Sequence, residues 1–131
     1  MNLRLAAILL ICLLNTHSFS QKKSKPKNPC QDAMSQGEIN MCTRRGFEQA
    51  DAELLRVVEK VKFEVKGYEG AAITFQIAQE KWLAYRDATC ESEAIIYMGG
   101  SIRPTILNTC LTSVTLERTQ RLKAFLSEMN Q

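Results

Sequence analysis

The stretch FEQADAELLRVVEKVKFEVKGYEG, residues 47–70, carries apolar side chains at helical spacing and ends in two glycines. Apolar residues that recur every three or four positions line one face of an α-helix. Gly67 and Gly70 mark the turn where this pattern stops. The stretch therefore predicts a long amphipathic helix, whose apolar face consists of Phe47, Ala50, Leu54, Val58, Val61 and Val65.

Two further stripes of the same period follow, separated by Gly99 and Gly100. We expect Ser101 to cap the third helix, and Pro104 is tolerated in a first helical turn. Nothing alternates as a strand does, so the expected fold class is all-α: three long helices in a small bundle, with a short N-terminal segment from Cys30 to Cys42. The two stripes are Ala71, Phe75, Ala78, Trp82, Tyr85 and Thr89, and then Leu107, Leu111, Val114, Leu122 and Phe125.

The N-terminus has the three parts of a signal peptide: Arg4, an apolar run over 5–14, and a small-x-small site that ends at Ser20. The run is shorter than the roughly 20 residues of a membrane span. We therefore expect a periplasmic or secreted protein with no transmembrane span. The expected organisation is a cleaved signal peptide over 1–20, a flexible Lys-rich arm over 21–29 and a helical domain over 30–128.

One of the five cysteines lies in the signal peptide, which leaves four in the mature chain. An even number in a short exported protein favours two disulfides, and four cysteines allow three pairings. We favour Cys30–Cys42 and Cys90–Cys110, because each bond would tie a local segment to the end of a neighbouring helix. A zinc site is disfavoured, since no two cysteines have the close spacing that structural zinc sites use.

The absence of histidine from the mature chain limits its chemistry. The single histidine is His17, in the signal peptide. Without histidine, the chain lacks Ser-His-Asp and Cys-His sites and histidine-ligated metals. Glycosidases use a pair of carboxylates, but no two carboxylates on the predicted helices have a spacing that distinguishes them from ordinary charged residues of a helix surface. We expect a non-enzymatic protein with no cofactor.

The charge is divided between the arm and the domain. The arm holds four lysines, and removing it and the signal peptide leaves 12 Lys and Arg against 14 Asp and Glu, a net charge of −2. A domain without a basic face is not suited to nucleic acid. The arm could make a weak contact with an anionic surface. Its lysines are Lys22, Lys23, Lys25 and Lys27.

Four charged residues lie on or beside the predicted apolar faces. Charges at such positions cost free energy unless they are paired, so we expect them to form structural ion pairs across the bundle. Trp82 and Tyr85 would pack beside them. The four residues are Asp51, Arg86, Asp87 and Arg118.

The order of these motifs resembles the LprI-like lysozyme inhibitor family of exported bacterial domains. The resemblance implies an exported helical domain stapled by disulfides, and inhibition of lysozyme. The motifs are Ser35-Gln36-x-Glu38-x-Asn40 between Cys30 and Cys42, Ala50-Asp51-Ala52-Glu53-Leu54, Gln79-x-x-Trp82-x-x-Tyr85-Arg86-Asp87-x-x-Cys90, Gly99-Gly100-Ser101-x-x-Pro104, Cys110, and Leu116-x-Arg118-x-x-x-Leu122.

A binding protein of this kind needs a protruding surface for its partner. The connection over 91–103 lies between Cys90 and Cys110, so we expect Tyr97, Ser101 and Arg103 to contact a lysozyme or another peptidoglycan-active protein and occlude it. Nearby glutamates would steer a basic partner. The alternative function is a structural or accessory envelope protein, held at an anionic surface by the basic arm.

Overall fold

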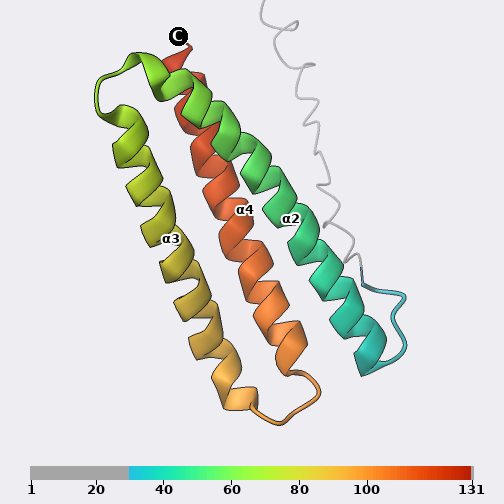
Figure 1. The fold of residues 1–131 in the computed structure, drawn as a ribbon. Helices are drawn as coiled ribbons and strands as arrows, with labels where there is room; N and C mark the ends of the chain where they lie inside the picture. Colours follow the sequence, from blue (N-terminus) through green and yellow to red (C-terminus); the bar gives the residue numbers. More distant parts are fainter. Residues whose placement is uncertain (1–29, 131) are drawn as a thin grey trace, which may run out of the picture.

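In a computed structural model, residues 30–130 form three long helices joined by short turns (Figure 1). Helix α2 spans Gln36–Glu64 and continues into a 3-10 turn, η1, at Val65–Gly67. Helix α3 spans Ala71–Ala94 and continues into η2 at Ile95–Tyr97, and α4 spans Arg103–Met129. The predicted all-α class is confirmed. The predicted signal peptide and Lys-rich arm lie outside the described residues.

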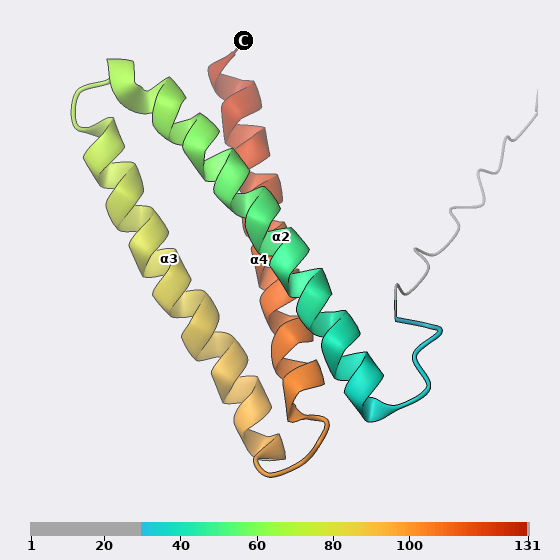
Figure 2. The ribbon, with the colours of Figure 1, turned by 45° about the vertical axis from the view of Figure 1, so that its right-hand side comes forward.

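Helix α4 is the central element of the bundle. Both neighbours pack on it, with α2 crossing it at an angle, whereas α2 and α3 hardly touch each other (Figures 1 and 2). The α3–α4 connection lies at the same end of the bundle as the start of α2. The α2–α3 connection and the C-terminus lie at the other end.

The core follows the apolar stripe of α2. Leu54, Val57, Val58 and Val61 are buried, and Leu122 of α4 packs against them. The stripe predicted from residues 47–70 therefore faces the core along its central and C-terminal part. Partly buried side chains complete the cluster, namely Ala71, Phe75, Trp82, Leu126 and Met129.

The first helix begins earlier than its apolar stripe. It starts at Gln36, so most of the predicted N-terminal segment Cys30–Cys42 is helical. Ser35 accepts a hydrogen bond from the Glu38 backbone, and the Glu38 carboxylate accepts one from the Ser35 backbone, which forms a capping box. This cap satisfies free backbone N–H groups, and it starts a helix where the hydrophobic pattern is still weak.

Two expectations at the ends and faces of the later helices were wrong. Ser101 does not cap the third helix, because α4 begins only at Arg103. The turn before α4 extends up to Arg103, whose N–H donates a hydrogen bond to the Gly100 carbonyl. Pro104 does lie in the first turn of α4. Tyr85 is 62% exposed rather than packed, because α3 is covered along only the narrow face that meets α4.

Within residues 30–130, none of the helices combines the length and the apolar character that a membrane crossing requires.

Candidate functional site

The α3–α4 connection is fixed at its base. A disulfide joins Cys90 near the end of α3 to Cys110 in α4, and a second one joins Cys30 to Cys42 in α2. This is the pairing that the sequence favoured. Cys90 and Ala94 are fully buried, so the end of α3 is held against α4 before the chain turns.

Glycine gives the connection its sharp turn. Gly99 has φ +80°, a left-handed conformation that side chains other than glycine rarely adopt. The Gly100 N–H donates to the Tyr97 carbonyl at 2.9 Å. A Cβ atom at Gly100 would lie 3.2 Å from that carbonyl oxygen, so the backbone is tightly packed there.

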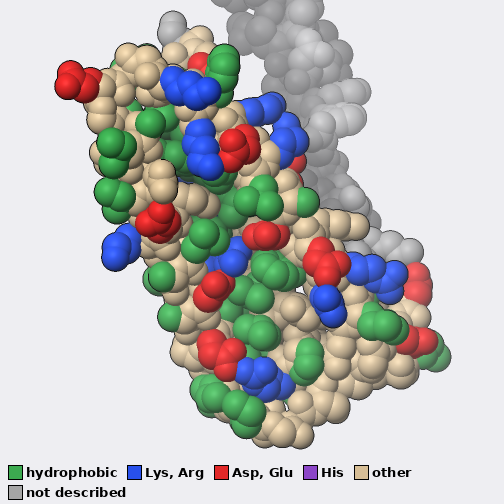
Figure 3. Space-filling view, in the orientation of Figure 1, with side chains coloured by type: hydrophobic (Ala, Val, Ile, Leu, Met, Phe, Trp, Pro, Cys, Tyr) green, Lys and Arg blue, Asp and Glu red, His purple; other side chains and the backbone are tan. Residues whose placement is uncertain are grey.

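The connection presents apolar side chains to solvent, which we call the apolar turn. Ile96 is 77% exposed and Met98 is 64% exposed. Figure 3 shows hydrophobic side chains gathered at this end of the bundle, over η2, with acidic and basic side chains next to them. The apolar turn consists of Ile95, Ile96, Tyr97, Met98 and Ile102.

The three predicted contact residues have different surroundings. Tyr97 belongs to the apolar turn, and Ser101 is exposed beside it. Arg103 forms an ion pair with Glu91, and its side chain is only 24% exposed. Arg103 is therefore not a free cation: it ties the start of α4 back to α3.

A polar cluster that the sequence analysis did not identify joins the connection to α2. The Asn40 amide donates to the Ser101 carbonyl at 3.0 Å. Asn40 Oδ1 accepts from Thr105 at 2.6 Å and from Gln36 at 3.0 Å, and Gln36 also donates to Thr105 at 2.9 Å. Asn40 and Gln36 were visible only as members of a family motif, because apolar periodicity carries no information on polar contacts between helices.

Carboxylates lie close to the same end. Backbone hydrogen bonds from Met34 and Ser35 lower the pKa of the Glu38 carboxyl, so it stays ionised below its ordinary range. Asp32, Glu91 and Glu93 are exposed as well. The surroundings of the apolar turn are therefore acidic.

The buried face of α3 that carries Cys90 and Ala94 also carries an arginine that fastens the bundle. Arg86 is 8% exposed, and its Nη1 donates to Asp51 of α2 at 2.9 Å while its Nε donates to Asp87 at 2.8 Å. Its guanidinium also lies over the rings of Phe47 and Trp82, at 5.4 and 5.3 Å from their centroids. A buried cation with these partners has the surroundings of a structural group rather than of a catalytic one.

Arg118 also lies over the Trp82 ring, at 5.6 Å from the ring centroid. We expected it to join an ion pair, but among residues 30–130 no carboxylate lies within salt-bridge distance of it. The amide oxygen of Gln79 accepts from its Nη2 at 3.1 Å instead. Burial and the nearby Arg121 lower the pKa of the Arg118 guanidinium.

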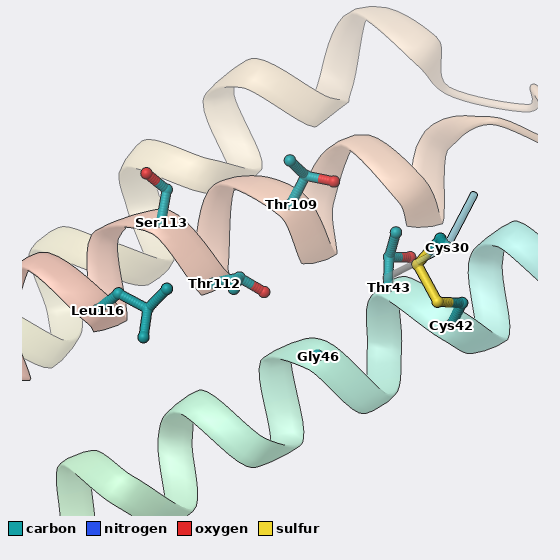
Figure 4. Close-up of a pocket in the computed structure, with 8 residues that line it drawn as sticks. All are labelled: Cys30, Cys42, Thr43, Gly46, Thr109, Thr112, Ser113 and Leu116. Carbon is teal, nitrogen blue, oxygen red and sulfur yellow. A yellow bond between two sulfur atoms is a disulfide. The ribbon is translucent and has the colours of Figure 1, made fainter. Parts of the chain in front are cut away.

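A pocket of about 340 Å³ opens between α2 and α4 beside the Cys30–Cys42 disulfide (Figure 4). The hydroxyls of Thr43 and Thr112 donate to carbonyls of their own helices, so they offer methyl groups to the pocket. Its walls are apolar and uncharged, which gives it no group for acid–base chemistry. The lining is Cys30, Cys42, Thr43, Gly46, Thr109, Thr112, Ser113 and Leu116.

The described part of the chain also holds no group of three or more His, Cys, Asp or Glu residues that could ligate a metal. Residues 30–130 present a group of exposed apolar side chains at one end of the bundle. Such a surface is suited to binding another macromolecule.

Comparison with known proteins agrees with this description. The family model described as lysozyme inhibitor LprI matches residues 27–122. An uncharacterized protein of Rhizobium meliloti (strain 1021) is 31% identical over 129 residues, an alignment that covers 90% of each chain. No solved structure matches.

Proposed function

Because the chain belongs to the LprI lysozyme inhibitor family, we propose that it binds a lysozyme, or a related peptidoglycan-active protein, and blocks it without catalysing a reaction itself. The family match over residues 27–122 carries this proposal, because it spans nearly all of the folded domain. The exposed apolar residues at one end of the bundle supply a surface that could perform it.

The two disulfides and the family support a location outside the cytoplasm, since disulfides persist in oxidising compartments. We propose in addition that cleavage after Ser20 releases it to the periplasm or the medium. Mass spectrometry of the exported protein tests this step. A mature N-terminus at Gln21 supports the cleavage site, and an intact Met1 contradicts it.

Blocking requires that the domain cover the substrate cleft of the enzyme. A lysozyme has an acid-lined cleft in a basic body, so an inhibitor benefits from a protruding end with acidic surroundings. The connection over 91–103 protrudes in this way, and Tyr97 and Ser101 lie on its exposed side. Arg103, already paired with Glu91, would contribute at the edge of the contact.

The test is a turbidity assay of bacterial cell-wall lysis by c-type lysozyme, with an excess of the mature oxidised protein. We expect lysis to slow in proportion to the protein added. Circular dichroism checks that the sample is folded, and unchanged lysis by a folded sample contradicts the proposal. A protein lacking residues 21–29 serves as control, because inhibition should survive loss of the arm, whereas retention at an anionic surface should not.

A further inference from the structure

We propose that the apolar turn is the anchor that packs against the partner, and that this partner is a protein with a basic surface. The inference rests on the proposed function and extends it, because it names the side chains that bind. It moves the centre of the contact from the paired Arg103 to the exposed apolar side chains of the turn.

The first observation is exposure at a protruding position. Five large apolar side chains fall within 95–102, and nothing in residues 30–130 covers Ile96 or Met98. Grouped apolar residues on the surface of a soluble protein mark an interaction site. Arg103 Nη2 is paired with Glu91, and its Nε is buried without a hydrogen-bond partner among residues 30–130, so this cation is not displayed at the surface of the turn.

The second observation is that the backbone of the turn is preorganised. The Cys90–Cys110 disulfide holds its base, Gly99 provides its left-handed residue, and Asn40 anchors the Ser101 carbonyl to α2. A rigid binding element loses little conformational entropy on association. The backbone that carries Ile96 and Met98 is thus held in place before a partner binds.

The third observation, charge, selects the partner. The end of the bundle formed by residues 30–40 and 88–103 has one arginine and four carboxylates, a formal net charge of −3, while residues 30–131 as a whole carry −2. The remainder therefore carries +1, and the acidic charge is concentrated around the apolar turn. The carboxylates are Asp32, Glu38, Glu91 and Glu93.

This charge disfavours the two other occupants of an apolar surface. A second copy of the same end would bring two net charges of −3 together. An anionic lipid surface attracts basic rather than acidic segments. A basic protein is attracted instead, and the acidic surroundings should speed its encounter at low ionic strength.

The experiment measures binding of c-type lysozyme by titration calorimetry, with the mature oxidised protein and two double variants. The test variant is Ile96→Ser with Met98→Ser. The matched control is Phe63→Ser with Ile73→Ser, at the opposite end of the bundle, where the side chains are 67% and 68% exposed. Thermal unfolding checks that both variants are folded.

We expect the affinity of the test variant for lysozyme to fall about tenfold or more, which is the usual effect of removing interface hot spots. The affinity of the control variant should stay within about twofold of the wild-type value. Arg103→Ala should weaken binding much less than the test variant. Equal affinities of wild type and test variant, or an equal loss in the control, would overturn the anchor and leave the inhibitor proposal standing. A folded wild type that does not bind lysozyme would overturn both.

Two further measurements separate the alternative occupants. Flotation with vesicles of phosphatidylcholine and phosphatidylglycerol should show no difference between the test variant and wild type. Sedimentation should give the same mass for both. A loss of vesicle binding or of a dimer in the test variant, with lysozyme affinity unchanged, would contradict a basic protein as the occupant.

Discussion

Arg86 concentrates more interactions than any other side chain described above. It joins Asp51 of α2 to α3, and its guanidinium lies between two aromatic rings. Arginine is suited to this position because its planar group can donate several hydrogen bonds and stack at the same time. The residue therefore links α2 and α3, whose backbones hardly meet elsewhere.

We predict that Arg86→Ala lowers the free energy of unfolding by about 2–3 kcal/mol, because it removes a buried partner and leaves Asp51 unpaired. Urea denaturation of the oxidised protein measures the change. Arg44→Ala is the control, since its pair with Glu48 is exposed and should contribute about 0.5 kcal/mol or less. Similar losses in the two variants would contradict a fastening role for Arg86.

Single residues were predictable to different degrees. Asp51 and Arg86 could be singled out from sequence, because charges beside an apolar stripe need partners. The surroundings of Tyr85 and Arg118 could not, because they depend on how much of α3 meets α4. The ion pair of Arg103 was not predictable for a similar reason: its partner Glu91 lies on another helix and becomes a neighbour only after the chain turns.

At the scale of the element, α2 contains a glycine that its fold does not require. Gly46 lies in the helix interior, and a Cβ atom there would meet nothing within 4 Å. We predict that Gly46→Ala raises the free energy of unfolding by about 0.5–1 kcal/mol, because alanine restricts the unfolded chain and favours the helix.

Chemical denaturation measures this gain, and a loss of stability would contradict it. Gly99→Ala is the opposite control. It should destabilise the protein, because φ +80° is strained for alanine.

Helix α2 also carries a pH-sensitive link to α4. Hydrogen bonds from Arg56 and Lys123 lower the pKa of the Glu53 carboxyl to about 2. Since the folded pKa is below the ordinary value of 4.5, the stabilisation is present above pH 4.5 and is lost as the pH falls toward 2. The Glu53 side chain is 32% exposed, so solvent screening keeps this contribution small.

We predict that Glu53→Gln lowers the melting temperature slightly at pH 6 and leaves it nearly unchanged at pH 2, compared with wild type. Thermal unfolding between pH 6 and pH 2 measures both differences. A larger difference at pH 2 than at pH 6 would reverse the sign and contradict the link. Glu128→Gln is the control, because no ion pair is formed by Glu128 within residues 30–130.

Element boundaries show what periodicity leaves out. The apolar stripe from Phe47 predicted that the first helix exists. The start of this helix depends instead on the capping box of Ser35 and Glu38, a polar signal that apolar periodicity does not detect. The start of α4 was misplaced because the 3-10 and glycine turns extend to Arg103. Helix existence was thus predictable, and helix ends depended on local hydrogen bonds.

The whole molecule is a bundle in which one helix contacts the other two. The sequence predicted three helices and the disulfide pairing, but it did not predict that α4 would be central, because each stripe shows only that a face is buried. The polar cluster of Asn40 and Thr105 was equally inaccessible, since it joins residues far apart in the chain. Together these contacts hold the apolar turn at one acidic end.

Inhibition of the enzyme itself is the central claim, and it is tested most directly with a soluble substrate. The measurement is hydrolysis of a soluble chito-oligosaccharide by c-type lysozyme, titrated with the mature oxidised protein. No cell wall is present, so shielding of the envelope cannot cause an effect. We predict that hydrolysis falls to near zero at a one-to-one ratio when both proteins exceed the dissociation constant. Full hydrolysis at a large excess of folded protein would contradict the account.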